Sequence, residues 1–154
     1  MKQYFSKKVF SELFTVISLY IIIIAASAFF LKQEKVFGPL LIILGIITLL
    51  PIKFFHLSLR TLWPDIIFGI IDDGVLVVVA LIGAQLAGVF GAIAGGVVGN
   101  ALTDGIAGLF EGYTAERARR NRISEQRTAI GSALGKMAGC LLGAGAVLMV
   151  SGWV

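Results

Sequence analysis

Long apolar stretches, separated by short polar segments, dominate the pattern of hydrophobic and polar positions along the chain. A helix needs about 20 mostly apolar residues to cross the roughly 30 Å of hydrocarbon in a bilayer. Five stretches are close to this length, and they cover residues 9–31, 36–57, 66–82, 85–110 and 128–150. The pattern therefore predicts an all-α membrane protein with about five transmembrane helices.

The first two stretches are less regular than the other three. The second contains Pro51 and Lys53, and the first follows three lysines and contains "AASA", as a secretory signal peptide would. The apolar core of the first stretch is, however, longer than that of a usual signal peptide. We interpret both as helices, and we expect residues 1–63 to form an N-terminal two-helix membrane segment and residues 64–154 a three-helix core that carries a polar site.

The composition agrees with a membrane protein, and the charges indicate its orientation. Hydrophobic residues make up 58% of the chain and charged residues only 14%, which is too few for a soluble domain of this length. The net charge of +4 comes from bases beside the apolar stretches, without interleaved aromatic residues, so nucleic acid is not expected as a partner. With a cytoplasmic N-terminus, ten bases lie in inner segments and only Lys32 and Lys35 in outer ones. This count predicts that the N-terminus is cytoplasmic.

Glycines recur at regular spacing in the fourth and fifth stretches. The fourth has Gly91, Gly95 and Gly99 at every fourth position, and the fifth continues this spacing from residue 131 to residue 143 through Gly135 and Gly139. Faces without side chains let helix backbones approach closely. We expect these two helices to pack through their glycines, either with each other or across the axis of a homodimer with its interface at Gly135 and Gly139.

Ionisable residues lie inside three of the apolar stretches. Asp72 and Asp73 in the third stretch, Asp104 in the fourth and Lys136 in the fifth all fall about 10 Å inside the cytoplasmic boundary, at 1.5 Å per residue. Asn100 lies four residues before Asp104, hence on the same helix face. A carboxylate that faces lipid costs about 2.5–3.5 kcal/mol at the centre of a span. These side chains are therefore expected to face protein, water or a cation.

Several arrangements would satisfy these charges. A salt bridge of Lys136 with one aspartate would leave two acids unmatched, whereas a bound cation or a proton would complete the balance. Adjacent residues on a regular helix point about 100° apart, so Asp72 and Asp73 cannot both face one site if the helix is regular. Either the two aspartates serve different sites, or the helix unwinds locally. Gly74 and Gly105 are the candidate positions for such unwinding. Carboxylate, amide and carbonyl oxygens suit Ca²⁺, Mg²⁺ or Na⁺.

The sequence also resembles a known family. "FGIIDDG", "GGVVGNALTDGIAGLFEG" and "ALGKMAGCLLG" resemble, in order and spacing, the three-helix core of the transmembrane protein 65 family, over roughly residues 64–150. That family lies in the mitochondrial inner membrane and is linked to sodium-dependent calcium efflux. The matching positions are Asp72, Asn100, Thr103, Asp104 and Lys136.

This chain departs from the family pattern at two positions and at its start. The family commonly has asparagine where this chain has Asp73 and serine where it has Thr103, which leaves the charge and the selectivity for the ion open. The start, "MKQYFSKKVF", is not an arginine- and serine-rich transit peptide. We therefore expect a relative in a prokaryotic plasma membrane.

Together these features predict a secondary cation transporter, an exchanger of Ca²⁺ or Mg²⁺ coupled to Na⁺ or H⁺. The predicted metal site comprises Asp72, Asp73, Asn100, Thr103 and Asp104, with Asp72, Asp104 and Asn100 as direct ligands. Lys136 is the predicted counter-charge when the site is empty. The alternative is a non-transporting membrane subunit that docks a partner protein through its glycines and acids. Enzymatic activity is not expected because there is no positioned nucleophile, the histidine is alone and Cys140 lies among small residues that favour packing. No cofactor beyond the transported cations is expected.

Overall fold

The computed structural model of the chain describes residues 2–30, 32–121 and 128–152. Within these ranges every regular element is helical, which confirms the predicted all-α class. The elements are α1 (Lys2–Phe30), α2 (Glu34–Ile47), the short 3₁₀ helix η1 (Leu50–Ile52), α3 (Leu59–Asn121) and α4 (Ala129–Ser151). Four helical segments of the described chain are long and apolar enough to cross a membrane, which is consistent with a membrane location.

The second predicted stretch is divided between Ile47 and Pro51. Helix α2 ends at Ile47, and Pro51 lies in the first turn of η1. Proline has no N–H to donate, which suits it to the first turn of a helix, and here that helix is a short 3₁₀ turn. His56 follows with a positive φ of 52°. This irregular connection leads directly into α3.

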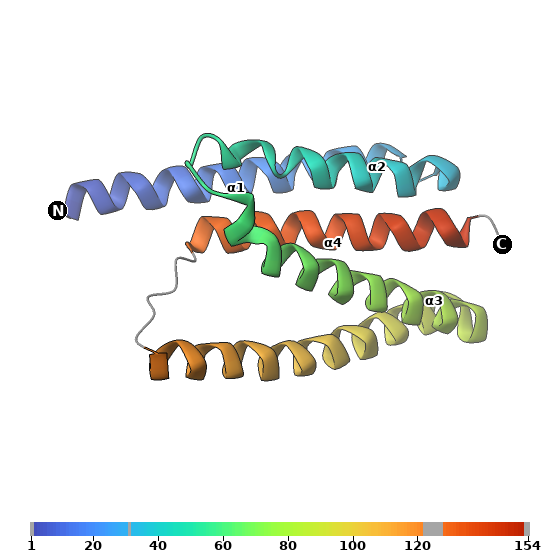
Figure 1. Cartoon of the computed structure of the whole chain (residues 1–154). Helices are drawn as coiled ribbons and strands as arrows, with labels where there is room; N and C mark the ends of the chain where they lie inside the picture. Colours follow the sequence, from blue (N-terminus) through green and yellow to red (C-terminus); the bar gives the residue numbers. More distant parts are fainter. Residues whose placement is uncertain (1, 31, 122–127, 153–154) are drawn as a thin grey trace.

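Helix α3 is bent back on itself, so the third and fourth predicted helices are two arms of one element (Figure 1). The bend lies at Ala87 (φ −143°, ψ 25°) and Gly88 (φ 59°, ψ −139°). We call residues 59–86 the first arm and residues 89–121 the second arm. The sequence predicts the break at residues 83–84, and the structure places it later because Gly88 adopts a left-handed backbone that other residues rarely enter.

The two arms touch backbone to backbone near the bend and separate farther from it. A Cβ added to Gly83 or to Gly91 would overlap the carbonyl of the other. Farther along, a Cβ on Gly99 would lie 2.9 Å from the Cα of Leu76. Toward its far end the second arm diverges from the first (Figure 1).

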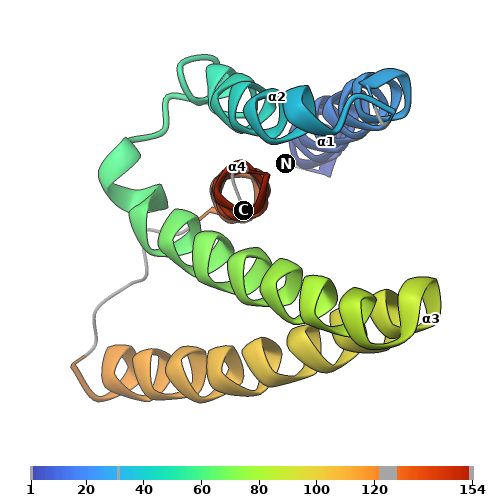
Figure 2. The same cartoon turned by 90° about the vertical axis from the view of Figure 1, so that its right-hand side faces the viewer.

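Helix α4 lies between the α1–α2 pair and the first arm of α3 (Figure 2). A Cβ on Gly135 would lie 2.8 Å from the Cβ of Asp65, and one on Gly139 would overlap the carbonyl of Ile66. The two glycine series therefore do not face each other, because each packs on the first arm of α3. Since Gly135 and Gly139 are buried within the chain, they do not form the predicted dimer interface.

Two apolar clusters hold the helices together. The first combines residues of α1, η1, the first arm and α4; it comprises Leu19, Ile52, Leu62, Ile66, Ile130 and Leu134. The second has Leu41, Leu44 and Ala144 at its centre and lies between α2 and α4. Neither cluster includes a described side chain of the second arm, so that arm depends on its contacts with the first.

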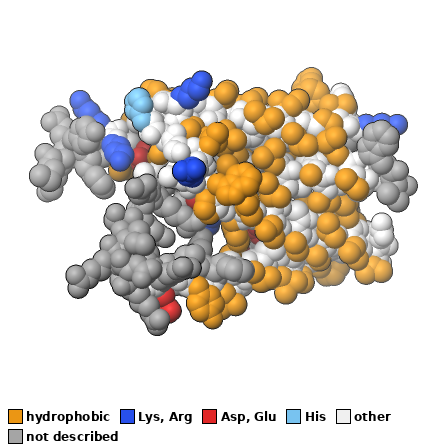
Figure 3. All heavy atoms as spheres, viewed as in Figure 1, with side chains coloured by type: hydrophobic (Ala, Val, Ile, Leu, Met, Phe, Trp, Pro, Cys, Tyr) orange, Lys and Arg blue, Asp and Glu red, His pale blue; other side chains and the backbone are white. Residues whose placement is uncertain are grey.

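The ends of the helices fall into two groups (Figure 1). The start of α1, the connection from α2 to α3 and the end of the second arm lie at one end of the molecule. The connection from α1 to α2, the bend in α3 and the end of α4 lie at the other. Hydrophobic side chains cover most of the visible surface between them, and most of the visible lysines and arginines gather near the N-terminal end (Figure 3).

The bend gives a stability prediction. We expect Gly88→Ala to lower the free energy of unfolding by about 1–3 kcal/mol, because alanine is strained at this φ and ψ. Gly74→Ala is the matched control, since Gly74 is helical with open space around an added Cβ, and this change should stabilise by about 0.5–1 kcal/mol. Thermal unfolding midpoints in one detergent measure both. Equal midpoints for the two variants would contradict the placement of the bend.

Candidate cation site

The first arm of α3 and α4 cross closely at Gly69. A Cβ added to this glycine would lie 2.6 Å from the carbonyl oxygen of Lys136 and 2.7 Å from the backbone nitrogen of Cys140. Asp72 and Asp73 follow Gly69 by three and four residues, so they lie one helical turn farther along the same side of α3. The close crossing thus brings both aspartates next to α4.

Two carboxylates and a thiol meet beyond this crossing. One ligand atom each of Asp72, Asp73 and Cys140 lies within 4.8 Å of the others, and all three residues are partly buried. The helix stays regular at Gly74 and at Gly105, so the predicted unwinding at these glycines does not occur. The aspartate Cβ atoms still diverge by about 100°, but the side chains are long enough for their carboxylates to approach one another.

The carboxylate of Asp72 also joins the two arms of α3. Thr103 Oγ1 on the second arm donates a hydrogen bond to Asp72 Oδ1 on the first. Thr103 is only 4% exposed, and its hydroxyl oxygen lies 3.1 Å from the carbonyl oxygen of Gly99 one turn earlier. A threonine hydroxyl has a single hydrogen to donate, so its bond to Asp72 is in competition with that local contact.

Asn100 and Asp104 form a separate pair on the second arm. Asn100 Nδ2 donates to Asp104 Oδ2 at 2.9 Å, and both residues are exposed. This agrees with the shared helix face that their spacing predicts. Asp104 is not a member of the group that Asp72 forms among the described acids, histidines and cysteines. The structure therefore brings Asp72, Asp73 and Thr103 together and leaves the Asn100–Asp104 pair beside them.

Lys136 lies on α4 at the same crossing. Its Nζ is 5.1 Å from the centroid of the Phe68 ring, which is a cation–π geometry. Cys140 follows Lys136 by four residues, so the ammonium and the thiol share one face of α4. The ammonium of Lys136 is thus positioned near the acids. Its role as a counter-charge to them stays a prediction.

Sequence reasoning missed two residues of this region. Asp65 was not singled out for the site because it lies just before the third apolar stretch. It is 2% exposed within α3, which begins at Leu59, and its Oδ2 accepts a hydrogen bond from Ser132 Oγ at 3.2 Å. Cys140 was expected only to pack. The spacing of four residues from Lys136 was the one available signal that Cys140 faces the polar region.

The arrangement is suited to binding a cation. Two carboxylates this close in an apolar region repel each other, and a proton or a cation between them relieves the repulsion. Carboxylate and hydroxyl oxygens favour hard cations, whereas a cysteine sulfur adds affinity for softer ones. The group can thus supply oxygen ligands from three side chains and one sulfur ligand.

The fold and the site define a class of protein: a helical protein with apolar helices fit to cross a membrane, and acids gathered between those helices. No protein-family model, curated protein or solved structure matches this chain. The resemblance to the transmembrane protein 65 family therefore stays a prediction from the sequence.

Proposed function

We propose that this protein is a secondary transporter that exchanges a divalent cation, Ca²⁺ or Mg²⁺, for Na⁺ or H⁺. The observation that carries the proposal is the approach of the Asp72 and Asp73 carboxylates within apolar helices. Acids inside membrane spans are costly and therefore rare, and they mark functional sites such as ion pathways and proton relays. The hydroxyl of Thr103 supplies a further oxygen beside Asp72.

The proposed topology has five crossings and a cytoplasmic N-terminus in a prokaryotic plasma membrane. The apolar part of α3, Leu59–Leu109, has 51 residues, or about 76 Å of helix, which is far more than one crossing needs. The bend divides this length into two crossings. The gathering of bases near the N-terminal end supports the orientation, because cytoplasmic loops carry the excess of lysine and arginine (Figure 3).

In this proposal the exchanged ions pass between the two arms of α3. In the proposed cycle the Asp72–Thr103 bond yields to ligation of the cation between the arms, and Asn100 and Asp104 provide exposed oxygens at the entrance. Lys136 offsets the negative charge after the cation leaves. A homodimer would cover the second arm, which contributes no described side chain to either apolar cluster.

Calorimetric titration of the purified protein with Ca²⁺, Mg²⁺ and Na⁺ tests the function. We expect saturable binding of one divalent cation, weakened when Na⁺ or H⁺ competes. The variant Asp73→Asn should still bind but with a changed preference between Ca²⁺ and Mg²⁺, because the family resemblance puts asparagine at this position. If the unmodified protein binds none of the three ions, the alternative of a subunit that docks a partner protein is favoured.

A further inference from the structure

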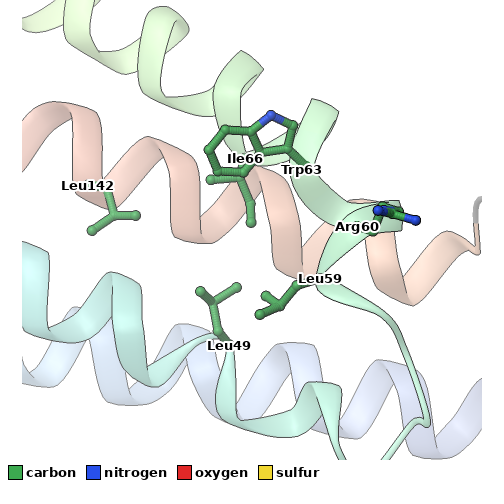
Figure 4. A pocket seen from close by; sticks show the side chains of 6 residues that line it. All are labelled: Leu49, Leu59, Arg60, Trp63, Ile66 and Leu142. Atoms are coloured by element: carbon green, nitrogen blue, oxygen red, sulfur yellow. The ribbon is translucent and has the colours of Figure 1, made fainter.

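A second feature, distant from the acids in the sequence, is an apolar pocket of about 640 Å³ where three elements meet (Figure 4). It lies beside η1, the start of α3 and the middle of α4. The lining residues are Leu49, Leu59, Arg60, Trp63, Ile66 and Leu142. Arg60 is the single charged residue among them.

The pocket has a polar edge and an apolar interior. Arg60 is in the first turn of α3, and Ile66 lies about 9 Å farther along the helix axis at 1.5 Å per residue. Trp63 stands between them, is 60% exposed and borders the pocket with its indole ring (Figure 4). Arg60 lies at one side of the pocket with its guanidinium directed away from the other labelled side chains (Figure 4). The rest of the lining is aliphatic or aromatic.

This polarity matches that of a phospholipid. The Arg60 edge, in the first turn of α3, adjoins the connection from α2 to α3, which carries the exposed Lys53 and lies at the N-terminal end of the molecule. In a bilayer that end is at the level of the headgroups, and the apolar side of the pocket is at the level of the acyl chains. Tryptophan prefers this boundary between the two.

We infer that the pocket holds one acyl chain of an anionic phospholipid, whose phosphate contacts Arg60. A guanidinium binds phosphate through charge-assisted and often bidentate hydrogen bonds. The excess negative charge of an anionic headgroup also complements Lys53 on the same connection. The inference requires the membrane location of the helices but not transport, so it stands or fails independently of the proposed function.

Quenching of Trp63 fluorescence by brominated lipids tests the inference. The sequence has two tryptophans, so Trp153→Phe leaves Trp63 as the single reporter. The protein is reconstituted in phosphatidylcholine bilayers that contain an equal, small fraction of either dibrominated phosphatidylglycerol or dibrominated phosphatidylcholine. We expect quenching by the anionic lipid to correspond to an affinity about fivefold higher than that of the neutral lipid.

Two further variants identify the anchor of the headgroup. Arg60→Gln should remove the preference for the brominated anionic lipid, whereas Lys53→Gln, on the same connection but outside the pocket lining, should retain most of it. Equal quenching by both lipids, or a preference that survives Arg60→Gln, would overturn the inference. Absence of quenching by either lipid would also overturn it, because the pocket would then be covered by protein.

Discussion

Changing Asp72 to asparagine should reduce cation flux in proteoliposomes by about 100-fold or more while the protein remains folded. The loss of groups that only support metal ligands already costs about 10–100-fold. Asparagine keeps the size of the side chain and can still accept a hydrogen bond from Thr103. It removes the charge that a divalent cation needs, so the effect on binding and flux should exceed the effect on stability. Flux of Ca²⁺ and Mg²⁺ is measured at equal protein density.

Two other acids on the second arm complete this experiment. Asp104→Asn should also reduce flux, since the proposed cycle uses the Asn100–Asp104 pair as its entrance and Asp104 directly follows Thr103 in the chain. Glu116→Gln is the matched control, because Glu116 is an exposed acid three turns farther along the same arm and is screened by water. Normal flux in Asp72→Asn would show that this aspartate is structural and would favour the docking alternative. If Glu116→Gln reduced cation flux as much as Asp72→Asn, the loss would reflect a general effect of negative charge and not a specific site.

Leucine at Gly139 should have a large effect on stability. A Cβ at this position would overlap the carbonyl of Ile66 and lie 2.9 Å from the Cα of Gly69. Backbone atoms cannot move aside as a flexible side chain can, so we expect a loss of about 3 kcal/mol or more, at the upper end for overpacked sites. The shift appears as a lower thermal unfolding midpoint in detergent, with loss of the contact between α3 and α4.

Gly105→Leu is the control for size and hydrophobicity. Gly105 is helical with no neighbouring atom within 4 Å of an added Cβ, so leucine there should change the midpoint little. The oligomeric state of both variants, measured by crosslinking in mild detergent, adds a second readout. The packing within the chain would be contradicted if Gly139→Leu kept its unfolding midpoint but converted a dimer into monomers. That result would instead support the dimer interface predicted from the sequence.

The arrangement of the acids explains why the resemblance and the geometry point to different residues. The family pattern puts weight on Asp72, Asn100 and Asp104, which lie at matching positions of a motif. The structure gathers Asp72 with Asp73, which the sequence also predicted for the site, and adds Cys140 from α4, which was expected only to pack. Titration of Asp73→Asn and flux in Asp104→Asn separate these two descriptions of the site.

Local properties of the sequence determined the helices and some of their pairs. Apolar length alone predicted the all-α class, because a span of hydrocarbon requires a continuous apolar segment. The bond between Asn100 and Asp104 followed from a spacing of four residues, since helix periodicity fixes which side chains are neighbours. The polar character of the region around Asp72 also followed, because acids stand out in an apolar stretch.

Only the tertiary structure decided where α3 bends and which surfaces meet. The sequence offers glycines at residues 83, 88 and 91, and the left-handed backbone of Gly88 selected the bend among them. The glycines of α4 pack on the first arm of α3 because close approach depends on the shapes of both helices, which spacing within one helix does not contain. Asp72 meets Thr103 because the two arms of α3 are in contact, and it meets Cys140 because the first arm also packs on α4.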